Sequence, residues 1–239
     1  MKAKTIVMML GHKSLRGKDT FASYLKYHGW NRHDWKRIAF ADKLKETVAD
    51  LYNFSHEQMH GSLKDVEDTR YPNNVDPETI TVYAKDDYGS IPFPGFDHQE
   101  PNPDYKPFLT PRRILQIFGQ NQRALYQDIW AQYVFNQIER MENTTDKIST
   151  PGTYVITDFR FKNEHVVAKR WASEGSGRII IPIRIDRDIE SKAGKFDVSE
   201  NDLDDFDEWE CKINNNNTLK DLEESAKVMH ELIKSEYEF

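Results

Sequence analysis

The sequence predicts an α/β fold with a five-stranded, mainly parallel sheet and helices on both of its faces. Segments with strand-like and helix-like patterns alternate five times along the 239 residues, and such alternation favours parallel strands joined by helical crossovers. The first strand pattern ends in a glycine-bounded turn that leads directly into a helix start, as in other open parallel sheets. Hydrophobic residues make up 38 % of the chain, enough for a single core or for a core with an inserted lobe.

The first part of the chain supplies two of the expected strands. Apolar and β-branched residues over positions 5–10 indicate a strand, and the apolar period over 18–28 indicates a helix that Gly29 ends. A short second strand is expected over 37–40. It leads into a helix over 41–54, whose apolar residues recur at helical spacing.

The second part supplies the remaining elements. Thr110 is a good N-cap and Pro111 suits the first helical position, so a helix begins there, and Gly119 is expected to interrupt it. The other expected elements are a helix over 125–141, strands over 153–157, 178–185 and 211–213, a helix around Val166 to Trp171, and a final helix over 219–232.

Two segments do not fit this alternation. Residues 55–110 are expected to form an inserted lobe, because the stretch up to Pro107 contains seven prolines and many aromatic residues. Loops of this length inside compact domains are usually lids or binding segments, although a mobile decoration without a function stays open. Residues 187–208 are expected to form a lid segment, since positions 192–207 are acidic and polar, as mobile segments often are.

The turn after the first strand has the residues of a phosphate-binding loop, or P-loop. Gly11 and Gly17 bound a polar, basic turn, and Lys18 stands at the helix start. Backbone N–H groups of the turn and of the first helical turn would point at one spot, where the helix dipole adds positive potential. Lys18 would supply a mobile charge for the β- and γ-phosphates. The sequence therefore predicts phosphate binding at this turn.

Two features of the loop are unusual. Five residues separate the glycines instead of four, and Asp19 follows the lysine where serine or threonine is normal, with Thr20 one place later. The alternative is a glycine-capped turn that binds nothing, in which Asp19 only favours the positive end of the helix. Phosphate binding explains the residues better, because Asp19 and Thr20 beside the lysine suit a phosphate and its Mg²⁺.

Charged residues also follow the other predicted strands. Asp42 and Lys43 come after the second strand, Asp158 after the third, and Arg187 after the fourth. Right-handed crossovers would place them with the loop at one edge of the sheet, where ligands bind in such folds. An acidic residue at a strand end holds Mg²⁺ in P-loop enzymes. For Asp42 and Lys43 the alternative of a solvated, capped helix start stays open.

The composition argues against several other classes of protein. A net charge of −7 does not suit a broad nucleic-acid footprint. No run approaches the roughly 18 apolar residues of a membrane span, and no signal peptide is expected, because the N-terminal apolar stretch is short. Cys211 is the only cysteine, which excludes an internal disulfide and a cysteine-based zinc site. A reduced, cytoplasmic setting is expected.

Several short segments, spread over nearly the whole chain, carry a further signal when they are taken together. They are GKDT (17–20), FADKLKE (40–46), TPRRILQIFG (110–119) with Arg123 and DIW (128–130), TDFRFKNE (157–164), the Ser199-Glu200 pair and INNNNTLKDL (213–222). In these segments and in their order the chain resembles the bacteriophage-type deoxynucleoside monophosphate kinases, P-loop phosphotransferases of the nucleoside monophosphate kinase class. The extra residue in the loop and Gln120 in place of a usual threonine depart from the family's pattern.

The resemblance implies a three-layer P-loop kinase fold over residues 1–239, with 55–110 as the acceptor-binding lobe and 187–208 as the lid. It implies ATP and Mg²⁺ as partners, a deoxynucleoside 5′-monophosphate as acceptor, and the cytoplasm as location, the host's cytoplasm if the protein comes from a phage. The lobe matches weakly, so the choice of base is not implied. A homodimer stays open, and neither a nucleic-acid partner nor a membrane is expected.

The predicted site residues divide into four sets. Arginine's planar fork matches phosphate oxygens, so arginines would hold the acceptor phosphate, while Arg187 would act from the lid as an arginine finger. Asp42 and Gln116 would contact the acceptor's sugar or base. The sets are, for ATP, Gly11, Lys13, Arg16, Gly17, Lys18, Asp19 and Thr20; for the acceptor, Asp42, Lys43, Arg112, Arg113, Gln116, Arg123 and Arg160; for catalysis, Lys18, Asp158, Arg160 and Arg187; and for Mg²⁺, Asp19, Thr20 and Asp158.

Two other functions remain open at this point. A P-loop kinase for another small acceptor, such as dephospho-coenzyme A or a phosphorylated metabolite, would share the loop and the strand order. A non-catalytic nucleotide-binding module would share the loop but would need no second phosphate site. The arginines of the helix that begins at Pro111 argue against the module.

Overall fold

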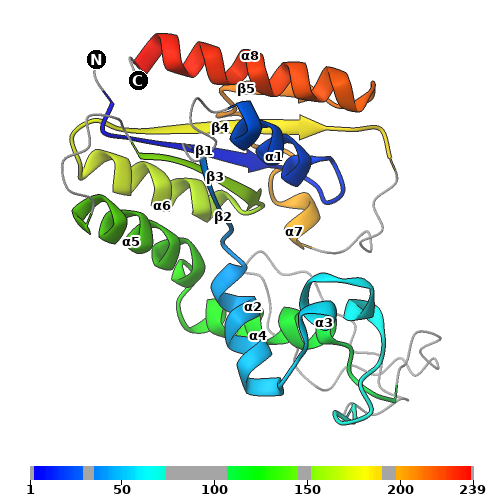
Figure 1. Ribbon diagram of the computed structural model, residues 1–239. Coiled ribbons are helices and arrows are strands. Elements are labelled where there is room, and N and C mark those ends of the chain that lie inside the picture. Colours follow the sequence, from blue (N-terminus) through cyan, green and yellow to red (C-terminus); the bar gives the residue numbers. More distant parts are fainter. Residues whose placement is uncertain (1–2, 29–34, 74–106, 145–151, 190–197, 238–239) are drawn as a thin grey trace. The chain divides into compact units, whose positions relative to one another are not determined.

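The computed structural model describes residues 3–28, 35–73, 107–144, 152–189 and 198–237 (Figure 1). The chain divides into two compact units. Unit 1 consists of Met1–Asp42 and Asp128–Phe239, and unit 2 of Lys43–Gln127. Unit 2 contains the whole of the predicted 55–110 lobe and also the helix before it; positions 74–106 of that lobe lie outside the described residues.

Unit 1 is built on one five-stranded sheet. Its strands are β1 (Thr5–Gly11), β2 (Trp35–Ile38), β3 (Gly152–Phe159), β4 (Arg178–Asp186) and β5 (Cys211–Asn214). They lie in the order β2-β3-β1-β4-β5, and every pairing is parallel. The predicted α/β class and the parallel sheet are therefore confirmed.

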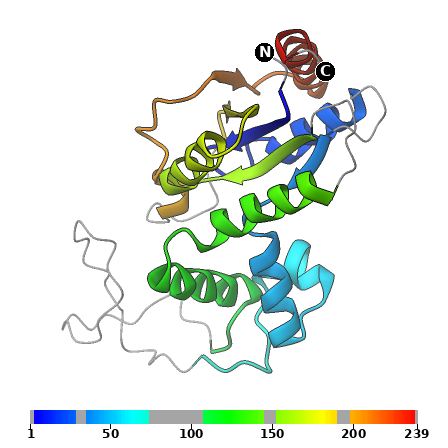
Figure 2. The same cartoon turned by 90° about the vertical axis from the view of Figure 1, so that its left-hand side faces the viewer.

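Helices cover both faces of this sheet (Figures 1 and 2). Helices α1 (Lys18–His28) and α8 (Leu219–Tyr237) pack together on one face, where Ile6, Met8 and Leu10 of β1 join their apolar residues in one core. Helices α5 (Ile129–Thr144) and α6 (Lys162–Ser173) lie on the other face. Strand β1 is buried along its whole length, which explains its unbroken apolar sequence.

The register of the strands brings the carboxyl ends of β1, β3 and β4 to the same edge of the sheet. Gly11 at the end of β1 lies beside Phe159 of β3 and beside Arg184 of β4. The turn after β1 and the residues after β3 and β4 therefore leave the sheet together. This confirms the expected common edge at the carboxyl ends of the strands.

The second strand lies two residues earlier than predicted. It covers Trp35–Ile38, and the Trp35 side chain is buried with its indole N–H donating to His230 Nδ1 at 3.1 Å. The backbone N–H groups of Ala39 and Phe40 bond to the carboxylates of Asp42 and Asp158 instead of to a neighbouring strand. Bonds to these two carboxylates thus end the strand at Ile38, whereas the sequence pattern predicted that it continues to Phe40.

Unit 2 contains α2 (Asp42–Tyr52), α3 (His56–His60), the 3₁₀ turn η1 (Ser62–Asp65) and α4 (Pro111–Leu125). Helix α4 starts as predicted, because the Thr110 hydroxyl oxygen accepts a hydrogen bond from the backbone N–H of Arg113. The predicted interruption at Gly119 is wrong. The helix continues to Leu125, since Gly119 is buried and gives Leu44 room: a Cβ there would lie 3.0 Å from Leu44 Cδ2.

Three other helix boundaries bear on the predictions. Because Leu125 belongs to α4, the next helix begins at Ile129 instead of 125. The final helix extends past 232 to Tyr237, and the predicted stop of α1 at Gly29 falls outside the described residues.

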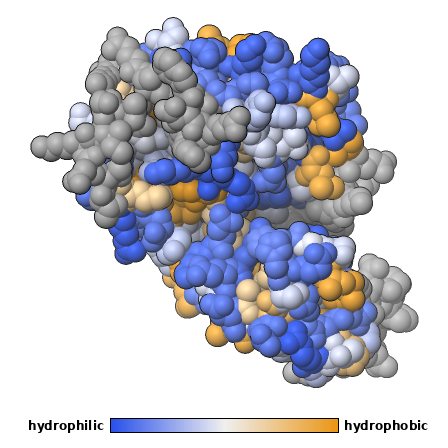
Figure 3. All heavy atoms as spheres, in the orientation of Figure 1, coloured by the Kyte–Doolittle hydropathy of each residue, from blue (hydrophilic) through white to orange (hydrophobic). Residues whose placement is uncertain are grey.

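The surface seen in Figure 3 is mostly hydrophilic over α8, in line with a mean hydropathy of −0.79 for the chain. Across the described ranges, no helix combines the length and the apolar character needed to span a membrane.

Candidate functional site

The loop between β1 and α1 has a backbone that only certain residues allow. His12, Leu15 and Gly17 have φ angles of 81°, 59° and 95°. At Gly17 a Cβ would also lie 2.4 Å from Nδ2 of Asn215, whose amide donates to the Arg16 carbonyl at 2.9 Å. Glycine is therefore required here both by the backbone angle and by the close approach of Asn215.

The other predicted glycine is required by packing alone. A Cβ at Gly11 would lie 2.5 Å from the Trp209 ring and 2.7 Å from the Phe159 ring. These rings and Phe206 pack against each other with centroids 4.8–5.5 Å apart. The start of the loop thus rests on an aromatic cluster.

Lys18 lies inside the loop. Its side chain is only 5 % exposed, and its ammonium group donates to the carbonyl oxygens of His12, at 3.2 Å, and Lys13. Burial, followed by the nearby charge of Arg160, lowers the pKa of Lys18 to about 8. The loop therefore holds a positive charge that is poorly solvated and well placed for an anion.

A glutamate from a distant segment lies against this loop. Glu200 of α7 (Val198–Asn201) is buried, and its two carboxylate oxygens accept the Ser14 backbone N–H at 3.0 and 3.2 Å. The same carboxylate forms an ion pair with Arg160. Burial raises the pKa of Glu200, but the Ser14 bond and the Arg160 charge outweigh it, so the pKa lies below its usual value.

The segment that carries Glu200 packs more firmly than its composition suggests. Leu203 and Phe206 are buried, and the Phe206 ring contacts Phe159 and His165 edge-on. Of the stretch 192–207, which the sequence analysis compared with mobile segments, the described part therefore packs on the sheet edge. Two well-spaced apolar side chains among acids are enough to anchor it.

His12 joins the loop to two acidic residues, a contact that sequence reasoning missed. Its Nδ1 lies 2.9 Å from Asp186 at the end of β4, and its Nε2 lies 3.0 Å from Asp204. Lys13 also pairs with Asp204 at 3.0 Å. Burial lowers the pKa of His12, against the raising effect of the Asp204 hydrogen bond. Nothing in the local pattern pairs these residues, because they are more than 170 positions apart.

The acidic residues after β3 have structural contacts of their own. The two Asp158 oxygens accept the N–H groups of Phe40, at 2.7 Å, and Ala41, at 2.9 Å. Glu164 is buried and accepts the N–H groups of Arg160 and Phe161. The Glu164 carboxylate therefore fixes the backbone at Arg160, and the Asp158 carboxylate fixes the turn that follows β2. The charge of Asp158 raises the pKa of Lys18, against the stronger lowering effects of burial and of Arg160.

The remaining predicted residues of unit 1 lie nearer to solvent. Asp19 is 76 % exposed and lies 3.5 Å from the Arg37 guanidinium, which is also 3.5 Å from Asp42. Asp42 accepts the Ala39 N–H at 2.9 Å, the capping role that the sequence analysis left open. Thr20 is half-buried in the first turn of α1, and Arg187 is exposed just after β4.

The other predicted acceptor residues belong to unit 2. The Arg112 side chain is 49 % exposed and pairs with Asp65, with Nη2 and Oδ2 3.0 Å apart. Arg113 and Gln116 are exposed, and Arg123 is half-buried. Lys43 pairs with Glu46 at 3.0 Å. The start of α4 thus presents a cationic, solvent-facing turn within unit 2.

The loop residues fit a bound phosphate chain. Arg16 Nε is buried without a hydrogen-bond partner among the described residues, although buried donors are nearly always satisfied. The Ser14 N–H already holds a carboxylate. Mg²⁺ prefers oxygen ligands and keeps several waters. Asp19 and Thr20 in the first turn of α1 carry side-chain oxygens of this kind. The described residues contain no group of three or more His, Cys, Asp or Glu side chains arranged for a metal, but Mg²⁺ bound with phosphates does not require one.

No family model matches the chain, and a search of curated proteins finds no match. The function must therefore be argued from the site.

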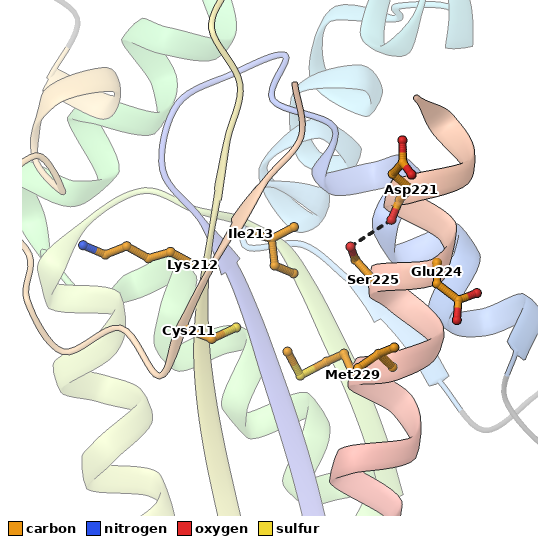
Figure 4. A pocket seen from close by; sticks show the side chains of 8 residues that line it. Cys211, Lys212, Ile213, Asp221, Glu224, Ser225 and Met229 are labelled. Atoms are coloured by element: carbon orange, nitrogen blue, oxygen red, sulfur yellow. Dashed lines mark hydrogen bonds between the residues drawn. The ribbon is translucent and has the colours of Figure 1, made fainter. Parts of the chain in front are cut away.

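A hollow on the surface of unit 1 lies between β5 and α8 (Figure 4). Its lining mixes apolar side chains such as Met229 with polar ones such as Ser225, whose hydroxyl donates to the Asp221 carbonyl at 2.8 Å. Cys211 lines it as well, and burial raises the pKa of that thiol. The thiol therefore stays protonated and unreactive at neutral pH.

Proposed function

We propose that the protein transfers the γ-phosphoryl group of ATP to a deoxynucleoside 5′-monophosphate, giving a deoxynucleoside diphosphate and ADP. The observation that carries this proposal is the loop from Gly11 to Lys18. It combines a buried ammonium group, three left-handed backbone positions and an amide that already binds a carboxylate. Such a loop at a helix N-terminus and a sheet edge suits the phosphates of a nucleotide.

The donor would be held by the loop. Lys18, Arg16 and the backbone amides would bind the ATP phosphates, with Lys13 and the two glycines completing the loop. Asp19 or Thr20 would hold Mg²⁺, and Asp158 would stand behind it through water. When bound, the ion neutralises charge on the β- and γ-phosphates.

The acceptor would be held by arginines. Arg160 lies beside Lys18 and Glu200 in unit 1, and Arg112 and Arg123 of α4 would add further guanidinium groups. A guanidinium binds phosphate oxygens in pairs and stays protonated, which suits a monophosphate. Secondary contacts to the acceptor, its sugar or its base are assigned to Asp42, Lys43, Arg113 and Gln116.

The reaction balances without a covalent enzyme intermediate. An oxygen of the acceptor's phosphate attacks the γ-phosphorus, the bond to the β–γ bridging oxygen breaks, and ADP leaves with that oxygen. Lys18 and Arg160 would stabilise charge on the transferred group, and Arg187 would join them from the 187–208 segment. Positioning and charge neutralisation provide most of the rate enhancement in such transfers.

The finer description of the fold belongs to the same proposal. The parallel order β2-β3-β1-β4-β5 with helices on both faces is compatible with a three-layer P-loop kinase fold. In that fold, residues 55–110 would serve as the acceptor-binding lobe and residues 187–208 as the lid.

The test is an assay of purified protein with ATP, Mg²⁺ and each of the four deoxynucleoside monophosphates and their ribose counterparts. We expect formation of ADP and of the matching diphosphate with at least one deoxynucleotide, at a rate at least about 100-fold lower with Lys18→Ala. Transfer only to dephospho-coenzyme A or another phosphorylated metabolite would replace the acceptor. ATP binding with no transfer to any acceptor would favour a binding module, and no ATP binding would overturn the proposal.

A further inference from the structure

The Ser14 amide of the loop and the guanidinium of Arg160, just after β3, already hold an anion that is part of the protein. Glu200 Oε1 and Oε2 lie 3.2 and 3.0 Å from the Ser14 nitrogen, and the carboxylate is paired with Arg160. Its charge also acts on the Lys18 ammonium, whose pKa it raises against the effect of burial. One carboxylate thus faces an amide, a guanidinium and an ammonium group of the loop edge.

These three groups are the ones that a phosphate would need. A carboxylate is planar and a phosphate is tetrahedral, but both are oxyanions that accept hydrogen bonds from backbone N–H groups and pair with a guanidinium group. The Glu200 side chain is 6 % exposed, so the anion is also removed from water, as a bound phosphate would be. The same amide and guanidinium cannot fully serve a carboxylate and a phosphate together, because the two anions would repel at this distance.

We propose that Glu200 is an internal phosphate mimic, which occupies the anion position of the loop in the unliganded protein and is displaced when nucleotide phosphates bind. The inference rests on the proposed function for the identity of the ligand, a nucleoside triphosphate. It adds that Arg160 exchanges partners: it pairs with Glu200 in the resting protein and with phosphate in the loaded one.

This arrangement has two consequences. A buried ion pair satisfies Arg160 and the Ser14 N–H while no ligand is present, and so avoids unpaired buried groups. It also lowers the apparent affinity for the ligand, because only the fraction of molecules with Glu200 displaced can bind.

The neighbouring acids do not share this position. Asp204 pairs with His12 and Lys13, and Asp205 pairs with Lys162 at 2.7 Å. Asp205 is exposed and pairs with a lysine outside the loop, yet it lies on the same segment as Glu200. It therefore offers a matched control that removes one negative charge without emptying the anion position.

The experiment measures binding by isothermal titration calorimetry, with Mg-ATP and with inorganic tripolyphosphate as separate probes and no acceptor present. The proteins are the wild type, Glu200→Gln, Glu200→Ala and Asp205→Asn. Loss of a charge-assisted contact that competes with the ligand should tighten the Kd of both Glu200 variants about tenfold. Asp205→Asn should change the Kd less than about twofold, because exposed charges are screened by salt.

A measurement on the wild type covers the case in which a Glu200 variant does not fold. Hydrogen–deuterium exchange of the peptide that contains residues 199–206 should increase when tripolyphosphate is added, since α7 loses its contact with Ser14. A purely structural role of Glu200 predicts different results in both experiments. Exchange of this peptide would stay unchanged or become slower, and both Glu200 variants would bind the two probes more weakly. Either of those results would overturn the proposal.

The outcomes separate this inference from the proposed function. Tighter binding by the Glu200 variants without transfer to any deoxynucleotide would keep the mimic and remove the kinase. Transfer to a deoxynucleotide with no tightening would keep the kinase and remove the mimic. Absence of binding by every protein to either probe would remove both.

Discussion

The loop edge of unit 1 and the start of α4 in unit 2 carry similar cationic groups in opposite surroundings. Lys18 is buried and bonded to loop carbonyls, and Arg160 is paired with the buried Glu200. Arg112, in contrast, is about half exposed and pairs with Asp65, itself exposed. The first group is fixed by the surrounding fold, whereas the second keeps its side-chain freedom.

The difference has an energetic meaning. Interactions between buried charges are screened little by solvent, so the loop's groups are already arranged before a ligand arrives. Exposed pairs contribute about 0–1 kcal/mol and weaken with salt, so the α4 arginines can change partner at little cost. We infer that the loop provides rigid charge stabilisation and that the α4 turn provides adaptable binding.

The largest effect is expected at Lys18. Lys18→Ala should lower turnover at least about 100-fold, the scale of losing one charge partner of the transition state. Steady-state assays of ADP formation measure this, and circular dichroism shows that the variant is folded. Lys18→Met, which keeps most of the volume, should lose turnover equally without loss of thermal stability. Near-normal turnover in either variant would remove Lys18 from the mechanism and end the comparison.

The next effect contrasts two glycines, one in each region. Gly17→Ala should destabilise the protein by about 1–3 kcal/mol, because φ of 95° is strained for alanine and its Cβ would meet Asn215. Gly119→Ala in α4 should stay within about 1 kcal/mol of the wild type, since better helix propensity offsets the Leu44 contact. Thermal and urea denaturation compare the two. Equal losses would contradict the contrast between a rigid loop in unit 1 and a tolerant helix in unit 2.

The buried lysine also predicts a dependence on pH. The pKa of Lys18 is lowered to about 8 in the unliganded protein, so the ammonium charge is present below that pH and lost above it. At pH 9 only about a tenth of the molecules keep the charge, and Mg-ATP should bind about tenfold more weakly than at pH 7. Titration calorimetry at both pH values tests this. Lys18→Met should show no such change, and a flat wild-type profile would contradict the assignment.

The lowered pKa has a second, opposite consequence for folding. Because the folded protein binds this proton less tightly than the unfolded chain, Lys18 costs stability below about pH 8. That cost disappears as the pH rises from about 8 towards 10.5, the usual value for lysine. The charged Lys18 ammonium group therefore lowers the stability of the folded protein, while the proposed function uses the same charge to bind phosphate.

The smallest effect is expected at α4. Arg112→Ala should raise the KM for the acceptor about fivefold to tenfold, the range for one charge-assisted contact, while the Kd of Mg-ATP is retained. Asp65→Asn is the control: it removes the carboxylate charge that pairs with Arg112 and should change stability by less than about 1 kcal/mol. Equal losses of acceptor and ATP binding in Arg112→Ala would misassign the arginine.

Much of the fold was predictable because its signals are local. The apolar run of β1, the glycines of the loop and the capped start of α4 each depend on neighbours within a few residues. Boundaries failed where distant side chains intervened. The Asp158 carboxylate takes the Phe40 N–H and ends β2 early, and Leu44 accommodates Gly119 so that α4 continues.

The sequence by itself determined the α/β class, the parallel sheet, the loop with Lys18 at its end, and the common edge for the residues that follow β3 and β4. Hydrophobic periodicity, glycine geometry and crossover handedness are enough for these. Only the tertiary structure decided what surrounds the loop: Glu200 on the Ser14 amide, His12 between Asp186 and Asp204, and Asn215 behind Gly17. These contacts join positions more than 170 residues apart, and no local pattern encodes which distant polar group a buried donor will meet.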